Sequence, residues 1–207
     1  MPSDDLWIEE ELSPLPTRRL TLREVRMDDA PAIATLANDR HIAEMTARIP
    51  YPYRLEDAKE FLARTRHELT FAIMRNADDA FMGLISLREK DDSDALDLGY
   101  WLGRPFWNKG YATEAAHAVI DYAFGELAAE AVEIRCRVIN NASRRVIHKC
   151  GFHYQGVGMD VSAVAGRVAS ESYRMDRRCW LSLKSWVRDT SPVPAGELDQ
   201  VCLLYTS

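Results

Sequence analysis

The segment GYWLGRPFWNKGYATEA, residues 99–115, constrains the fold most, because a strand-like pattern passes through a short loop into a helical pattern. At such a junction the first amides of the helix point at one centre, and the positive end of the helix favours an anion there. Gly110 can adopt backbone angles closed to branched residues, and Ala112 leaves room at the first turn. Lys109 adds a positive charge and Thr113 a hydroxyl. The segment therefore predicts a cradle for a diphosphate.

Two other phosphate-binding sequences are absent. A P-loop requires G-x-x-x-x-G-K-[ST], which occurs nowhere in the chain. A dinucleotide-binding fingerprint requires G-x-G-x-x-G directly after a strand, and Gly156-x-Gly158 is only a fragment of it in another place. The segment at 99–115 is therefore the candidate phosphate site.

Hydrophobic periodicity predicts an α/β (α+β) fold with a mixed, mostly antiparallel sheet flanked by helices. A full helix separates the strands at 95–103 and 131–139, so we expect these two to be parallel neighbours. An acidic cap at Asp28-Asp29 followed by Pro31 predicts a helix start, and Gly151 predicts a helix end. The expected order is strand 18–25, a helix from about residue 30, helix 54–66, strands 69–75, 81–88 and 95–103, helix 111–127, strand 131–139, a short helix ending at 151, and strands 152–157 and 168–175.

Residues 18–183 are expected to form one domain, preceded by a loose, acidic arm at 1–17. The remainder, 184–207, has loop composition and then an abrupt apolar VCLLY. We interpret this tail as a disordered segment, an oligomer contact or non-native sequence, and assign no function to it.

Charge and cysteine content narrow the function classes. The chain has 26 basic and 32 acidic residues, a formal net charge of -6, which argues against a dedicated nucleic-acid binder. It shows neither a signal peptide nor an apolar stretch long enough for a membrane span. Its four cysteines lack zinc-ligand spacing, and His148, Cys150 and His153 are not expected to converge on a metal. We expect a cytoplasmic, reducing location and no metal.

At this point the sequence resembles the GNAT acetyltransferase superfamily. Residues 107–112, WNKGYA, occupy the six positions of its [QR]-x-x-G-x-[GA] motif, and 140–152, NNASRRVIHKCGF, is similar to its N-x-x-S…K-x-G-F run. The aromatic first position followed by GYATEA resembles the branch of ribosomal-protein N-terminal alanine and serine acetyltransferases. The likeness covers roughly residues 17–181 and departs at Asn108, where the branch often has glycine.

The resemblance implies that the two parallel strands splay apart and that acetyl-CoA enters the gap. Backbone groups of Leu102 and Gly103 would pair with the pantetheine arm, and an N–H near Leu102 would polarise the thioester carbonyl. Arg144 would reach a phosphate, and Trp107 fits a packing role as well as a direct contact. The cofactor-binding residues implied are Leu102, Gly103, Trp107, Asn108, Lys109, Gly110, Tyr111, Ala112, Thr113, Asn140, Ser143 and Arg144.

Catalysis requires removal of a proton from an ammonium group before the amine attacks. Asp97 matches the strand position where relatives often carry glutamate, so it is the candidate base, acting through water; a charged residue on an outer strand face is the competing interpretation. Many relatives use a tyrosine four residues before the G-F glycine to protonate the leaving thiolate. That position is Ile147 here, which leaves Ser143 as a substitute candidate.

The function implied is transfer of an acetyl group from acetyl-CoA to a primary amine, foremost a protein or peptide N-terminus. A small amine, amino acid or amine antibiotic is the alternative acceptor, and a catalytically weak CoA-binding regulatory module is the alternative of another class. Tyr51, Tyr53 and Arg54 lie where relatives bind the acceptor, although such a loop is as often simple packing. We expect a monomer or homodimer.

Overall fold

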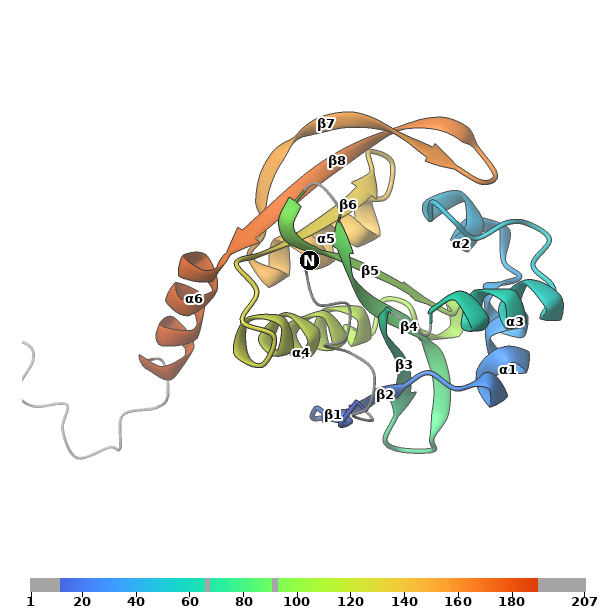
Figure 1. Cartoon of the computed structure of the whole chain (residues 1–207), viewed down its shortest axis with the longest axis horizontal. Helices are drawn as coiled ribbons and strands as arrows, with labels where there is room; N and C mark the ends of the chain where they lie inside the picture. The colour runs from blue at the N-terminus through green and yellow to red at the C-terminus, as the bar shows by residue number, and fades with distance from the viewer. Residues whose placement is uncertain (1–11, 66–67, 91–92, 190–207) are drawn as a thin grey trace, which may run out of the picture.

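A computed structural model describes residues 12–65, 68–90 and 93–189. The molecule is built on one eight-stranded sheet with strand order β1-β2-β3-β4-β5-β6-β8-β7, as Figure 1 shows. Every neighbouring pair is antiparallel except β5 and β6, which run parallel. The strands are β1 Leu15–Pro16, β2 Leu20–Glu24, β3 Leu69–Arg75, β4 Ala80–Lys90, β5 Ser93–Leu102, β6 Ala131–Arg137, β7 His153–Ser162 and β8 Gly166–Asp176.

Helices cover both faces of this sheet. The main core packs α4 and α5 against one face, and a second core packs α1 and α3 against the other, around Ala72 and Leu84. The helix α4 lies in the main core because its small and apolar residues recur at helical spacing, so that one stripe is fully buried. The helices are α1 Ala30–Ala37, α2 Arg40–Met45, α3 Leu55–Arg64, α4 Tyr111–Gly125, α5 Asn141–Cys150 and α6 Arg177–Asp189, with single 3-10 turns η1 Met27–Asp29 and η3 Arg104–Phe106.

The parallel pair β5 and β6 separates partway along its length. The two strands pair from Ala95 opposite Ala131 to Leu98 opposite Ile134. Beyond these positions β5 continues to Leu102 against β4, and β6 continues to Arg137 against β8. The sheet therefore divides at this point, which is the splayed pair that the sequence predicts.

The predicted fold class and the parallel pair are confirmed. Gly151 ends α5 with a φ of 87°, as predicted. The acidic cap of α1 is wrong in detail, because Asp29 does not bind the helix amides. Its carboxylate accepts hydrogen bonds from the Arg23 guanidinium and from Arg26 N, and so joins β2 to the helix.

Three elements lie outside the predicted set. Residues 15–16, inside the expected arm, form β1 against β2, and α2 occupies a segment without a clear apolar stripe. The third, α6, extends across the expected domain boundary at 183/184. Residues 190–207, most of the expected tail, lie outside the described part of the chain, as do residues 1–11. Within the described ranges, no helix combines the length and apolar character that crossing a membrane requires.

Candidate functional site

A cleft of about 1300 Å³ passes through the sheet where β5 and β6 diverge. Its lining comes from both faces of the sheet: the loop before α4 and the start of α5 on one side, and α2, α3 and the tip of the β7–β8 hairpin on the other. Figure 1 shows that hairpin arching over the sheet toward α2. Ala163 N donates to Ala47 O at 2.8 Å, and Ser162 Oγ donates to Thr46 O, so the hairpin tip is fastened across the cleft.

Backbone groups of β5 are exposed to the gap at alternate residues. Gly103 N donates to Met82 O at 2.8 Å, which fixes the alternation of the antiparallel ladder with β4. Tyr100 and Leu102 therefore direct their N–H and C=O groups away from β4 and toward the gap. The backbone groups of Gly103 do not face the gap, because its N–H donates to Met82 O and its carbonyl oxygen accepts a hydrogen bond from Phe106 N. Of the two predicted pantetheine partners the geometry thus favours Leu102, and it adds Tyr100 as a candidate that the sequence reasoning missed.

The loop between β5 and α4 has the shape that the sequence predicts. Gly110 has a φ of 79° and Asn108 a φ of 59°, both in the left-handed region that glycine and asparagine tolerate best. The need for a positive φ explains why this position accepts asparagine in place of glycine. The amides of Tyr111, Ala112 and Thr113 open α4, and the first amides of a helix have no partner within it. These residues line the cleft, so the arrangement fits a diphosphate.

Side chains around the loop hold its shape. Lys109 Nζ donates to Pro105 O at 2.9 Å, so the ammonium lies against its own loop. Trp107 Nε1 donates to Leu102 O at 2.6 Å. Arg19, which sequence reasoning missed, lies over the Tyr111 ring and donates to Lys109 O at 2.9 Å. The only signal for Arg19 was its place at the start of a strand.

The opposite wall of the gap is the start of α5. Asn140 caps the helix by accepting Ser143 N at 3.0 Å, and Ser143 Oγ lies 3.0 Å from the Tyr100 hydroxyl. Burial raises the pKa of Tyr100, which outweighs the lowering by Ser143, so the phenol stays protonated at neutral pH. Ile147 is fully buried in the core. The hydroxyl groups of Tyr100 and Ser143 therefore form a hydrogen-bonded pair at this wall.

Arg144 does not line the cleft. Its guanidinium binds Glu171 at 2.8 Å and points along β8. The neighbouring Arg145, one residue further round the helix, lines the cleft together with Lys149. Each residue of an α-helix is rotated by about 100° from the one before it, so Arg144 and Arg145 lie on different faces of α5.

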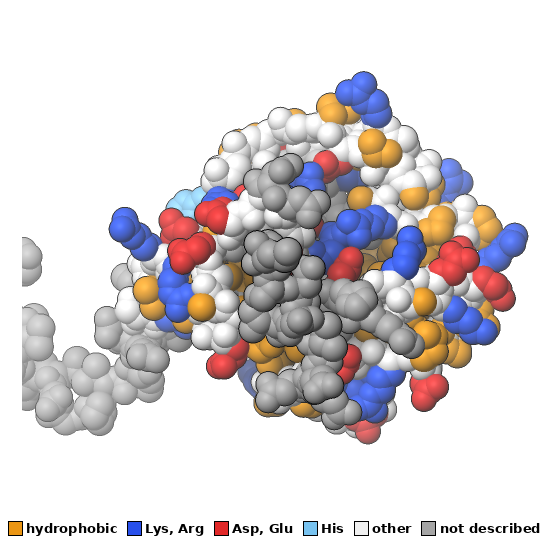
Figure 2. Space-filling model, in the orientation of Figure 1, with side chains coloured by type: hydrophobic (Ala, Val, Ile, Leu, Met, Phe, Trp, Pro, Cys, Tyr) orange, Lys and Arg blue, Asp and Glu red, His pale blue; other side chains and the backbone are white. Residues whose placement is uncertain are grey.

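The part of the cleft on the α2 and α3 side of the sheet is called the acceptor chamber here. Asp97 lies on its floor, is nearly buried, and binds Arg88 Nη2 at 2.8 Å. Tyr53 lines the chamber, and burial raises its pKa to about 12, whereas Tyr51 and Arg54 are exposed and outside the lining. Figure 2 shows basic side chains gathered between the β7–β8 hairpin and α3. The chamber is walled by α2, residues 46–50, Tyr53, α3, Glu68, Thr70, Ser86, Arg88, Asp97, Arg135, Arg137 and residues 160–162.

Within residues 12–65, 68–90 and 93–189, no group of three His, Cys, Asp or Glu side chains is placed to hold a metal ion. Cys136 and Cys150 are buried thiols, and burial raises their pKa values to about 11 and about 12. Neither of these two thiols is a thiolate at neutral pH, so neither is a ready nucleophile.

Comparisons with known proteins agree with this geometry. The sequence model of the acetyltransferase (GNAT) domain matches residues 19–153. The uncharacterised N-acetyltransferase p20 of Bacillus licheniformis is 26% identical over 73% of this chain and 89% of its own length. The structure of the ribosomal-protein-S5-alanine acetyltransferase from Vibrio fischeri is similar with a TM-score of 0.68 and 18% identity, covering 81% of this chain and 98% of that one.

A second similar structure contains acetyl-CoA. The microcin C7 self-immunity acetyltransferase MccE, in complex with acetyl-CoA and AMP, has a TM-score of 0.67 and 20% identity, and the match covers 80% of this chain and 98% of that one. The domain match extends over more than half of the chain and includes the divided strands and the loop before α4. The chain therefore belongs to the GNAT family and is an acetyl-CoA-dependent N-acetyltransferase.

Proposed function

We propose that this protein acetylates the amino terminus of a peptide or protein. The observation that carries the proposal is the through-sheet cleft: the anion cradle opens on the α4 and α5 side, and the acceptor chamber opens on the other. The two substrates would approach from opposite faces and meet between β5 and β6. The likeness to a ribosomal-protein alanine acetyltransferase supports a peptide amine as the acceptor.

On the cofactor side, the first amides of α4 would hold the diphosphate, and Tyr100 and Leu102 would pair with the pantetheine arm. Arg145 and Lys149 supply positive charge at the same mouth. Acetyl-CoA supplies an activated thioester for attack by an amine. The gap-facing N–H groups of β5 would stabilise negative charge on the carbonyl oxygen, which is the role of an oxyanion hole.

Two groups are placed to move protons. Asp97, on the acceptor side, would take the proton of the ammonium through water, while the hydrogen bond from Arg88 Nη2 fixes the position of its carboxylate. On the cofactor side, the protonated Tyr100 hydroxyl, bonded to Ser143, would give a proton to the departing thiolate. The proposed base and the proposed acid would thus lie on opposite faces of the sheet, beside the amine and the thiol respectively.

Thiol release from acetyl-CoA, measured with a panel of N-terminal peptides, amino acids and small amines, tests the proposal. We expect peptides to raise release well above the background hydrolysis rate. Release with small amines alone would assign a small-molecule acceptor. Tight binding of acetyl-CoA without release for any amine would favour a CoA-binding regulatory module.

The variant Asp97→Asn tests the base. We expect kcat to fall by about 100-fold while the dissociation constant of acetyl-CoA stays within about twofold of that of the unmodified chain. Asp94→Asn is the matched control, because Asp94 lies on the same strand, binds Arg174 and is outside the cleft. An unchanged rate and pH profile for Asp97→Asn would remove Asp97 from the mechanism.

A further inference from the structure

Five arginines line the acceptor chamber, together with five carboxylates, which are those of Asp57, Glu60, Glu68, Asp97 and Asp160. Most of the arginines are hydrogen-bonded to none of these carboxylates. Two of the arginines are hydrogen-bonded to carboxylates: one pairs with Asp97, and Arg135 binds Asp160 at 2.9 Å. The remaining three, Arg48, Arg64 and Arg137, have no carboxylate at hydrogen-bond distance among the described residues.

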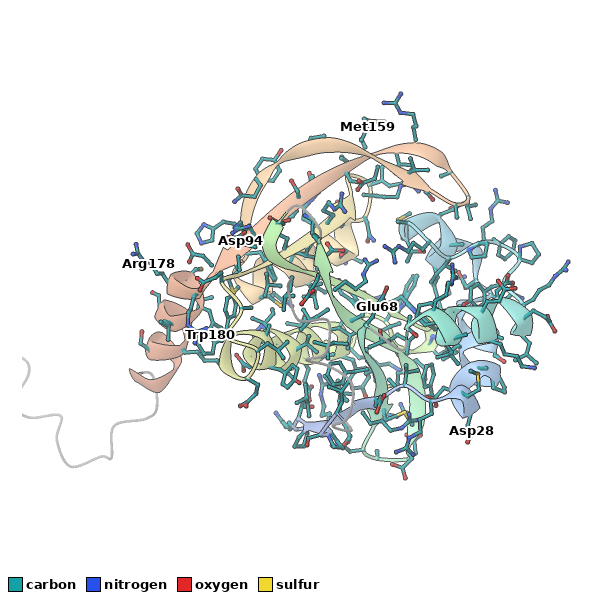
Figure 3. All side chains as sticks on the ribbon, in the orientation of Figure 1. Asp28, Glu68, Asp94, Met159, Arg178 and Trp180 are labelled. Atoms are coloured by element: carbon teal, nitrogen blue, oxygen red, sulfur yellow. The ribbon has the colours of Figure 1, made fainter. Side chains whose placement is uncertain are left out.

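The contacts of these three arginines leave most of their donors available. Arg48 Nη1 lies 3.8 Å from Glu68 Oε1, too far for a hydrogen bond. Arg64 Nε donates to Glu60 O, and Arg137 Nη1 donates to Glu44 O; both acceptors are backbone carbonyls without net charge. Figure 3 labels Glu68 between α3 and the strands of the sheet.

The arginines are also close to one another. Burial lowers the pKa of Arg48, and the positive charges of Arg88 and Arg64 lower it further, against Glu68 and Asp97, which raise it. Like charges within one chamber repel unless an anion lies among them. The two other acidic side chains of the wall lie on α3, where Asp57 accepts the Arg54 amide and caps the helix.

The same chamber contains incompletely bonded polar groups. Across residues 12–65, 68–90 and 93–189, three buried side-chain atoms bond to no other protein group: Thr70 Oγ1, Arg88 Nε and Arg137 Nε. All three residues line this cleft. Two of the atoms are cationic donors, so the wall stabilises negative charge placed beside it. A carboxylate matches the planar fork of a guanidinium with two parallel hydrogen bonds.

We propose that the acceptor is an acidic peptide N-terminus, whose first side chains present a carboxylate to Arg48 and Arg64 while the amine faces Asp97. This inference rests on the proposed function and adds a sequence preference to it. Recognition of the carboxylate would hold the amine at the gap, whereas a lysine side chain has no acceptor for the guanidinium donors.

Three heptapeptide amides that share an N-terminal serine, and carry glutamate, glutamine or lysine at the second and third positions, test the preference. We expect kcat/KM to rise about tenfold from glutamine to glutamate and to fall by at least as much for lysine, because a charge-assisted hydrogen bond is of that strength. The preference should weaken as salt rises, since screening acts on exposed charges.

Variants then assign the preference to named residues. Arg48→Gln and Arg64→Gln should each reduce the glutamate-to-glutamine ratio, and the double variant should bring it close to one, with thermal unfolding confirming that the protein folds. Arg178→Gln is the matched control: Arg178 is exposed on α6, far from the chamber in Figure 3, and should keep the full ratio. Calorimetric titration of each peptide gives the same comparison without turnover.

The outcomes separate the two proposals. Acetylation of all three peptides at similar rates, or a ratio that survives in the double variant, would overturn the acidic preference and leave the peptide acetyltransferase standing. Acetylation of free glutamate but of no peptide would overturn the peptide acceptor. If no amine releases thiol, the calorimetric comparison still decides whether Arg48 and Arg64 bind an acidic peptide.

Discussion

Trp107 donates its indole Nε1–H to the carbonyl oxygen of Leu102 at 2.6 Å, and so ties the loop that precedes α4 to the last residue of β5. The bond occupies one of the two backbone groups that Leu102 turns toward the gap, and it leaves the N–H for a ligand. The indole thereby fixes the distance between the strand edge and the anion cradle. This explains an aromatic residue at the first position of the motif without requiring the ring itself to touch the cofactor.

Replacing Trp107 with phenylalanine keeps the ring but removes the donor. The Leu102 carbonyl then loses its partner, so we expect the free energy of unfolding to fall by about 1 kcal/mol and the KM for acetyl-CoA to rise about tenfold. Urea unfolding and steady-state kinetics measure the two effects. Trp180→Phe removes a similar bond, from Trp180 Nε1 to Asp121 at 2.8 Å on the far side of α4. Trp180→Phe should lower the free energy of unfolding but leave the KM for acetyl-CoA unchanged. A rise in this KM in both variants would contradict a local role for Trp107.

The positive φ of Gly110 is a second testable feature of the cradle. A Cβ at this position would come no closer than 3.4 Å to its nearest neighbour, Arg19 Nη2, so Gly110→Ala acts through backbone strain. We expect a loss of about 1–2 kcal/mol in stability and an at least tenfold higher dissociation constant for acetyl-CoA. Gly166→Ala, at a φ of 64° in the β7–β8 turn with open space around it, should lower stability without changing the dissociation constant of acetyl-CoA. Unaltered acetyl-CoA binding by Gly110→Ala would show that the loop tolerates another shape.

Sequence reasoning succeeded where structure follows from local pattern. The segment 99–115 predicts its own strand, loop and helix because alternation, glycine and helical spacing are all read within a few residues. The parallel pairing of β5 and β6 followed from one intervening helix, and the divided sheet followed from the family resemblance. Both features determine where the site lies.

The remainder depended on contacts between distant residues. Arg144 was assigned to the cofactor, but Glu171, which is 27 positions away, holds its guanidinium on another face. Lys109 was expected to add positive charge at the cradle, and its ammonium bonds the backbone of its own loop. The five arginines of the acceptor chamber come from α3, β4, β6 and the loop at residues 46–50. No local sequence pattern predicts which of these side chains lie in the same cavity.

Tyr100 is the proposed proton donor for the departing thiolate. Tyr100→Phe should lower kcat by about 100-fold with little change in KM, because the hydroxyl is removed while the ring stays in the core. Ser143→Ala should cause a smaller loss, since Ser143 only orients the phenol. Tyr173→Phe is the control, because it removes a hydroxyl bonded to Glu171 at 2.8 Å outside the cleft. An unchanged kcat for Tyr100→Phe would mean that water protonates the thiolate.

Acid sensitivity of the fold should depend in part on Glu133, which joins β4, β6 and β8. Burial acts to raise the pKa of Glu133, but hydrogen bonds from Lys90 and Arg174 lower it by more, so the folded pKa lies below the unfolded value. A carboxylate with a lowered folded pKa stabilises the protein above its unfolded pKa of about 4.3, and this stabilisation is lost as the pH falls through the folded value.

The stability difference between the unmodified chain and Glu133→Gln should therefore be largest near neutral pH and shrink as the pH falls below about 4.3. Its size at neutral pH should stay within about 1 kcal/mol, because the Glu133 side chain is still 25% exposed and solvent screens the pairs. Unfolding midpoints measured across the pH range give the comparison. Glu89→Gln, at an exposed position on β4, should show no such dependence. A difference for Glu133→Gln that grows in acid would reverse the sign of the linkage and show that the lowered pKa is wrong.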